Sequence, residues 1–155
     1  MAGREAVLLR DNHVSHIMTR DFTSLAPSAS MAEIKRILSE DHDADIVVVD
    51  SNERPLGMVG FADIEDVAFE AGLNNLLYAK DLMHLGPAVL QAEDTLTTLL
   101  HRMDASAVDR MAVVADDDSG RVIGVAHREQ ALKAYSTALM IDWRESSGNR
   151  RKHPR

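Results

Sequence analysis

IVVVDSNERPLGMVGFADIEDV (Ile46–Val67) is the stretch that predicts the fold of this chain. Two short apolar runs, Ile46–Val49 and Leu56–Val59, flank a segment of turn-forming residues. Because neither run has a polar face, we expect a hairpin whose strands are covered on both faces. Gly60 and Asp63 follow where the second strand should give way to a helix. A glycine lets a ligand approach the backbone closely, and a carboxylate at a helix start can accept hydrogen bonds from ligand hydroxyls or cap the helix.

The same pattern occurs a second time along the chain. Met111–Val114 corresponds to Ile46–Val49 at an offset of 65 residues, and Gly124 corresponds to Gly57 at an offset of 67, after a longer turn. Each unit is predicted to run strand, helix, strand, strand, helix. One unit of this size buries little core by itself, so we expect the two repeats to pack together around a pseudo-twofold axis.

The duplication predicts how the chain is organised. We expect a lead segment at 1–12, a first repeat at 13–72, a linker helix at 73–79, a second repeat at 80–141 and a disordered basic tail at 142–155. Ser30 and Thr95 are N-cap residues at matching positions and predict the first helix of each repeat. The second helix of the first repeat is expected from about Phe61 to the C-capping Gly72.

Composition limits the classes of function. The net charge is −8, and five basic residues and one acidic residue follow Trp143, so this tail is +4 and the rest of the chain −12. Such an acidic body disfavours nucleic acid as a partner, whereas the tail is either simply solvated or contacts anionic lipid or an acidic partner. The absence of cysteine excludes disulfides and thiol chemistry. We expect a cytoplasmic protein, because no apolar run approaches the ~20 residues that span a bilayer and the N-terminus does not suit a signal peptide.

In their order and repetition these motifs resemble a tandem pair of CBS domains, the Bateman module, over about Val14–Tyr135. The motifs that carry the resemblance are Ile17-Met18 and Leu82-Met83, the strands Val47–Asp50 and Met111–Ala115, and the junction Leu56–Asp63. The resemblance implies an α/β fold of the mixed α+β kind. It also implies that the chain is not an enzyme, since the family has no catalytic chemistry of its own.

The resemblance further implies a regulatory sensor. Family members bind ATP, ADP, AMP or another adenosyl compound between the two repeats and transmit occupancy to a transporter, channel or enzyme. In the family's junction motif a Ser or Thr faces phosphate and an Asp binds the two ribose hydroxyls. The ligand contacts carried over to this chain are Phe22, Thr23, Ile46, Gly60, Phe61, Asp63, His127, Arg128 and Gln130. We expect the backbone of Phe22 and Thr23 against adenine and Asp63 on ribose.

Both junctions depart from the family's motif. In the first, Asp63 is present but Gly60 stands where Ser or Thr is usual. In the second, His127 takes the hydroxyl position and Gln130 the Asp position. The first junction therefore predicts a ribose site with a weakened phosphate end, and the second predicts phosphate contacts through His127 and Arg128 without a good ribose site. Helix capping is the alternative role for Asp63.

A narrower resemblance concerns the link between the repeats. Glu70–Met83, together with Leu8–Arg10 and His13–Ser15, is similar to the cytosolic tail of bacterial CLC-type chloride channels and transporters, which would place the chain at the inner membrane face. A free-standing sensor is the alternative. We expect a homodimer in either case, and a ligand-free dimerisation and docking module is the alternative function. No metal cofactor is expected, because His13 and His16 have no third ligand and Asp116–Gly120 does not match a calcium loop.

Overall fold

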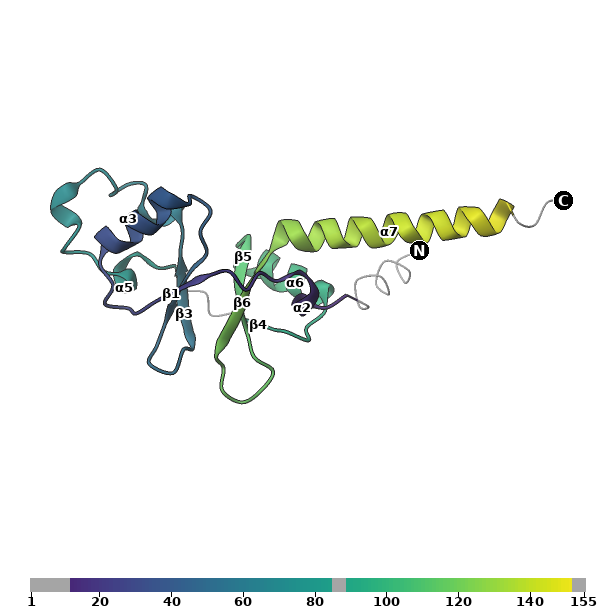
Figure 1. The fold of residues 1–155 in the computed structure, drawn as a ribbon, viewed down its shortest axis with the longest axis horizontal. Helices are drawn as coiled ribbons and strands as arrows, with labels where there is room; N and C mark the ends of the chain where they lie inside the picture. Colours follow the sequence, from purple (N-terminus) through teal and green to yellow (C-terminus); the bar gives the residue numbers. More distant parts are fainter. Residues whose placement is uncertain (1–11, 85–88, 152–155) are drawn as a thin grey trace.

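The computed structural model describes residues 12–84 and 89–151, with side chains as far as Ser146. Within these residues the chain forms two similar repeats that lie side by side, with a long helix extending from the second (Figure 1). The elements of the first half are α2 (Val14–Ile17), β1 (Thr23–Leu25), α3 (Met31–Glu40), β2 (Ile46–Val49), β3 (Pro55–Val59), α4 (Phe61–Ile64) and the 3-10 turn η1 (Ala71–Leu73). Those of the second half are α5 (Ala79–Leu82), β4 (Leu90–Gln91), α6 (Leu96–Ser106), β5 (Arg110–Val114), β6 (Val122–His127) and α7 (Arg128–Arg151).

Each repeat contains one three-stranded sheet of the same topology. β1 pairs parallel with β2, and β2 pairs antiparallel with β3; β4, β5 and β6 repeat this order. The hydroxyl groups of Ser30 and Thr95 accept hydrogen bonds from the third residue of α3 and of α6, as the N-cap prediction requires. The mixed α+β class and the duplicated order of elements are thereby confirmed.

The two sheets pack against each other through one face and carry helices on the other. Val47 of β2 and Ala112 of β5 occupy equivalent positions and share the cluster between the sheets with Met58 and Val125. Ile46 and Val48 point to the opposite face and pack under α3. Every residue of β2 is therefore buried, which confirms for this strand that both faces are covered, whereas in β3 only Gly57–Val59 are buried and Leu56 is exposed.

The short helices α2 and α5 are exchanged between the repeats. Val14 of α2 lies in the core of the second repeat, whereas Ala79 of α5 lies in the core of the first. Figure 1 shows α5 beside α3, and α2 contacts α7 and β6 of the second repeat. Backbone hydrogen bonds fix both helices at equivalent places, from Val14 N to Asp94 O at 2.9 Å and from Ala79 N to Ala29 O at 2.7 Å.

The chain segments that follow α2 and α5 run against the sheet of the opposite repeat. Thr19 exchanges two backbone hydrogen bonds with Val125 of β6, and His84 does the same with Met58 of β3. These two segments, the crossing segments, lie so close to the sheet that a Cβ atom on the glycine facing each of them would collide with it. The Cβ would lie 2.7 Å from His84 O at Gly57 and 2.9 Å from Thr19 O at Gly124. The paired glycines therefore make room for backbone of the same chain.

Several expected boundaries differ in the structure. The helix that begins at Phe61 ends at Ile64, because acidic residues destabilise its C-terminal end and Phe69, 97% exposed, finds nothing to pack against. The expected linker helix at 73–79 is replaced by η1, turns and the start of α5. The expected disordered tail is wrong as far as Arg151, because α7 continues unbroken to that residue. The lead segment up to residue 11 and the tail from 152 lie outside the described residues.

Among the residues that the structure describes, no helix combines the length and the apolar character needed to cross a membrane.

Replacing Gly57 or Gly124 by alanine is expected to lower the free energy of unfolding by about 1–3 kcal/mol, because the new methyl group overlaps a carbonyl oxygen that cannot move away cheaply. Gly72→Ala is the matched control, because a Cβ there meets open space, and a change of no more than about 0.5 kcal/mol is expected. Urea unfolding of the three variants measures the difference. Equal stabilities would contradict the tight crossing.

Candidate functional site

Two clefts open along the seam between the repeats and are related by the pseudo-twofold axis. The first, with a volume of about 620 Å³, lies between the segment leading into β1 and the start of α7. The second, of about 540 Å³, lies between the start of α4 and the end of α6. Both volumes fall within the range of small-molecule sites. The described lining residues that bear on ligand binding are, in the first cleft, Phe22, Thr23, Asp45, His127 and Gln130. In the second cleft they are Gly60, Phe61, Asp63, His84 and Arg110.

The structure separates residues that the sequence had grouped in one site. Phe22 and Thr23 line the first cleft with Gln130, whereas Asp63 lines the second. The expected pairing of adenine at Phe22–Thr23 with ribose at Asp63 is therefore wrong. The physical reason is the crossing, which brings the segment before β1 against β6 and hence beside the junction of the opposite repeat.

Two further predicted contact residues, Ile46 and Arg128, do not line either of the two clefts. Ile46 is fully buried in β2, between Thr23 and Val59 in the sheet, and belongs to the core. Arg128 lies in a further hollow beside the first cleft, with its guanidinium paired with Asp104.

Asp63 holds its carboxylate in place with two partners at the second cleft. Its Oδ2 accepts a hydrogen bond from the Gly60 N–H at 2.7 Å and so caps the start of α4. The Nδ1 of His84 lies 3.1 Å from Oδ2 and 3.2 Å from Oδ1. The Asp63 side chain is 21% exposed, so both oxygens remain close to solvent at the cleft surface.

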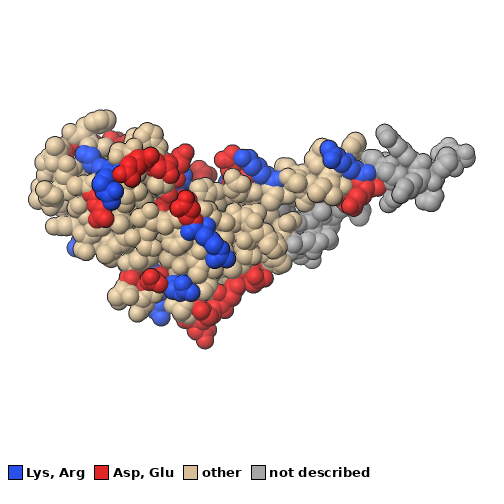
Figure 2. Space-filling model, viewed as in Figure 1, with Lys and Arg blue, Asp and Glu red and all other residues tan. Residues whose placement is uncertain are grey.

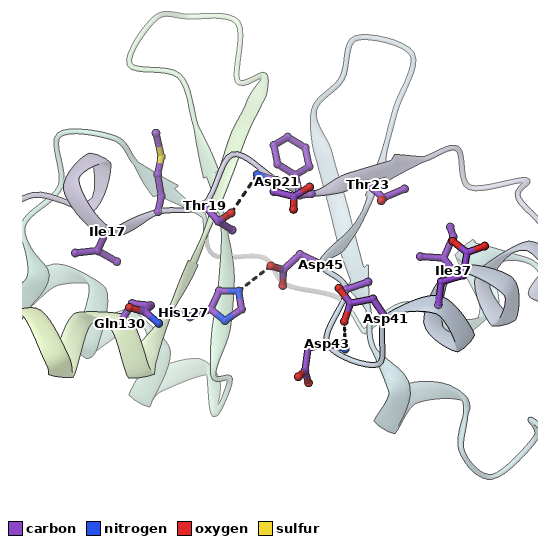
Figure 3. Close-up of a pocket in the computed structure, with 14 residues that line it drawn as sticks. Ile17, Thr19, Asp21, Thr23, Ile37, Asp41, Asp43, Asp45, His127 and Gln130 are labelled. Atoms are coloured by element: carbon purple, nitrogen blue, oxygen red, sulfur yellow. Dashed lines mark hydrogen bonds and ion pairs between the residues drawn. The ribbon is translucent and has the colours of Figure 1, made fainter.

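A buried carboxylate joins the repeats at the first cleft. Asp45, at the start of β2, is 6% exposed and accepts hydrogen bonds from Arg110 Nη1 at 2.8 Å and from His127 Nε2 at 2.7 Å. Figure 3 shows Asp45 and His127 reaching toward each other from the two sides of the cleft. Arg110 also donates to the carbonyl oxygen of Asp43 at 3.2 Å. Because a buried ion needs such partners, this network ties the relative position of the two repeats to the rim of the cleft.

The first cleft is rich in carboxylates. Those among its described lining residues are Asp21, Glu40, Asp41, Asp43 and Asp45. His127 and the Arg110 guanidinium behind it offset only part of this charge. The second cleft is more evenly balanced, with Asp43, Asp63 and Asp109 beside Arg110 and two histidines.

Acidic side chains also gather at the tip of the β5–β6 turn, away from the clefts (Figure 2). There the hydroxyl and backbone N–H of Ser119 donate to Asp117 and hold the pKa of its carboxyl below the ordinary value. Within the described part of the chain, no three His, Asp or Glu side chains converge as a metal ion would require.

Sequence reasoning missed Asp45, Arg110 and His84. A usable signal was present, because Asp45 and Arg110 occupy equivalent positions 65 residues apart and carry opposite charges. His84 is likewise the equivalent of Thr19, so comparison of the repeats alone marks it as a difference between the two clefts.

We expect Asp45 and Arg110 to show a coupling free energy of about 1–3 kcal/mol in a double-mutant cycle of Asp45→Ala and Arg110→Ala, because each single substitution leaves a charge without its buried partner. Urea unfolding of the four proteins measures it. The exposed pair Arg36–Glu40 is the control, with an expected coupling of about 0.5 kcal/mol or less. Additive effects at Asp45 and Arg110 would contradict the bridge.

Comparisons with known proteins agree with this architecture. An uncharacterized protein from Methanopyrus kandleri is 21% identical over 126 residues, which cover 81% of this chain and 63% of that protein. This chain thus spans less than two thirds of that curated relative. The CBS domain of a bacterial CNNM/CorC family Mg²⁺ transporter in complex with ATP shares the fold, with a TM-score of 0.73, 17% identity, and coverage of 86% of this chain and 93% of that one. CBSX2 in complex with AMP is 25% identical, with a TM-score of 0.65 and coverage of 84% and 98%.

A family model described as "CBS domain" matches this chain at residues 14–69 and again at 79–137. The two matches cover most of the chain and coincide with the two structural repeats. The chain therefore belongs to the CBS domain family, as a tandem pair of such domains.

Proposed function

We propose that this CBS pair is a regulatory module that binds an adenosine nucleotide in its second cleft and modulates an attached or partner protein. The observation that carries the proposal is the position of Asp63, which presents two carboxylate oxygens to a cleft that Arg110 also lines. A carboxylate can accept both hydroxyl hydrogens of a ribose, and a guanidinium suits phosphate. The AMP complex of CBSX2, at 25% identity over nearly the whole of that chain, supports the ligand class.

Charge favours the second cleft over the first. A nucleotide phosphate in the first cleft would lie among five carboxylates, and the ribose would meet Gln130, which accepts through a single uncharged oxygen. In the second cleft the carboxylates are fewer, and one of them is the proposed ribose acceptor. Gly60 supplies no hydroxyl for phosphate, so Arg110 is the group that we propose to meet the phosphate end.

Arg110 also suggests how occupancy could be transmitted. Arg110 lines the second cleft, and its guanidinium bonds Asp45 of the other repeat. A phosphate that attracts Arg110 would weaken that bond and shift the preferred angle between repeats, which is how a ligand biases a conformational equilibrium. We propose a regulatory and non-catalytic role on this basis.

For the regulated partner, we propose a membrane transport protein, with the module on its cytoplasmic side. The fold shared with the CBS domain of the CNNM/CorC family Mg²⁺ transporter makes this class reasonable. A chloride channel or transporter is the narrower proposal, and it rests on the resemblance at Glu70–Met83. The coding sequence around this chain would distinguish a transporter tail from a free-standing sensor.

Helix α7 favours a second candidate function, that of a dimerisation and docking module. Beyond its first turns α7 projects from the body (Figure 1), and its exposed apolar side chains include Leu139, Met140, Ile141 and Trp143. A single helix is marginally stable in water unless an apolar face is packed. We propose a second copy of the chain as the occupant, since it offers an equivalent helix together with an acidic body that complements the basic end of α7.

ATP, ADP or AMP at about ten times its dissociation constant is expected to raise the melting temperature by about 3–6 °C, through mass action on the folded state. Asp63→Ala should abolish the rise. Gln130→Ala is the matched control at the equivalent position of the first cleft and should leave the rise intact. Loss of the rise in Gln130→Ala alone would assign the nucleotide to the first cleft, and no shift with any adenosyl compound would contradict nucleotide sensing.

Sedimentation velocity is expected to show a dimer whose population grows with protein concentration. The double substitution Leu139→Lys and Trp143→Lys should shift it to monomer, because both side chains project from the exposed part of α7. Thr137→Lys, on an exposed polar position of the same helix, is the control. A wild-type protein that stays monomeric at high concentration would rule out the dimer.

A further inference from the structure

We infer that His84 is an internal competitor for the ribose position, so that a nucleotide enters the second cleft only by displacing the His84 imidazole from Asp63. The inference rests on the proposed nucleotide site and adds the residue that controls access to it. One imidazole N–H stands within reach of both carboxylate oxygens, at 3.1 and 3.2 Å. These are the two acceptors that a vicinal diol would use.

The second partner of Asp63 does not compete with a ligand. The Gly60 N–H approaches Oδ2 at 2.7 Å from the backbone of the junction and belongs to the start of α4. Because an ionised carboxylate has about four lone-pair sites, this bond can persist while the two oxygens accept ribose hydroxyls. The imidazole is thus the group that has to leave.

His84 can leave without undoing the contact between the repeats. Its backbone is fixed, since its N–H donates to Met58 O at 3.0 Å and its carbonyl accepts from Met58 N at 3.3 Å. Its side chain is 38% exposed, so a change of rotamer carries the ring to solvent. The interaction lost is a partly exposed pair, which is a weak one.

The equivalent crossing of the other repeat is made without such a contact. Thr19 stands at the position of His84, and its backbone pairs with Val125 in the same way. The Thr19 hydroxyl accepts a hydrogen bond from the Asp21 N–H at 3.1 Å, within its own turn. The His84–Asp63 contact is therefore dispensable for the crossing and is specific to the second cleft.

A competitor of this kind lowers the apparent affinity by the fraction of molecules in which Asp63 is free. It also couples ligand binding to the crossing segment, because the displaced ring belongs to the residue that joins that segment to β3. The nucleotide would then alter the environment of a residue at the seam between the repeats.

Calorimetric titration of ATP into four proteins tests the inference: wild type, His84→Ala, His84→Thr and Asp63→Ala. His84→Thr installs the residue found at the equivalent crossing and protects against a folding defect of the alanine variant. Both His84 variants are expected to bind about three- to fivefold more tightly than wild type, the range set by removal of a partly exposed pair. Asp63→Ala should not bind. NMR signals of the His84 ring in the wild type should shift on addition of ATP.

The outcomes separate this inference from the function on which it rests. Tighter binding by both His84 variants, or binding by these variants when wild type shows none, supports it. If wild type binds ATP through Asp63 and the His84 variants bind equally or more weakly, His84 is not a competitor, although the nucleotide site stands. If none of the four proteins binds an adenosyl compound, the proposed function falls, and this inference falls with it.

Discussion

The close passage of each crossing segment over the sheet of the opposite repeat is the contact on which the rest of the structure depends. A backbone can approach another backbone this closely only where no side chain intervenes, and Gly57 and Gly124 provide those two places. Once the crossings form, α2 and α5 are carried into exchanged cores, and the segment before β1 is brought to the junction of the other repeat. The positions of both clefts follow from this one steric requirement.

The sequence was sufficient to predict the duplication, the sheets and the N-capped helices, because these depend on local periodicity and on side chains a few residues apart. It was insufficient to predict which segments line the same cleft. The junction that faces Phe22 is determined by the crossing of the chain between the repeats. This long-range contact gives no signal in the local periodicity of Ile46–Val49. The sequence also did not predict the lengths of the last helix in each repeat. The segments after Phe61 and after Arg128 occupy equivalent places, yet α4 stops after four residues and α7 continues for 24.

The two repeats have kept their backbone and diverged in charge. Side chains at equivalent positions meet near a pseudo-twofold axis, where two like charges would repel each other in a poorly solvated place. Asp45 and Arg110 resolve this by carrying opposite charges, and the pair cannot be exchanged without also moving His127. Because Asp45 and Arg110 differ in charge, the two clefts differ in chemistry although the backbone around them is arranged alike. Similar differences at His84 and Thr19, and at Asp63 and Gln130, extend the asymmetry outward from the axis.

The exchanged helices also determine the order in which the chain can fold. Val14 leaves the ribosome early, but the pocket that receives it is built from Leu90, Leu96 and Met103, which are made much later. The first repeat, in turn, lacks Ala79 until the chain has passed beyond its own sheet. Neither core can close as an autonomous unit, and the contacts that complete each one join residues far apart in sequence. Folding is thereby expected to be a single cooperative event of the whole pair, slow by the standard of local topologies, with no stable half-molecule along the way.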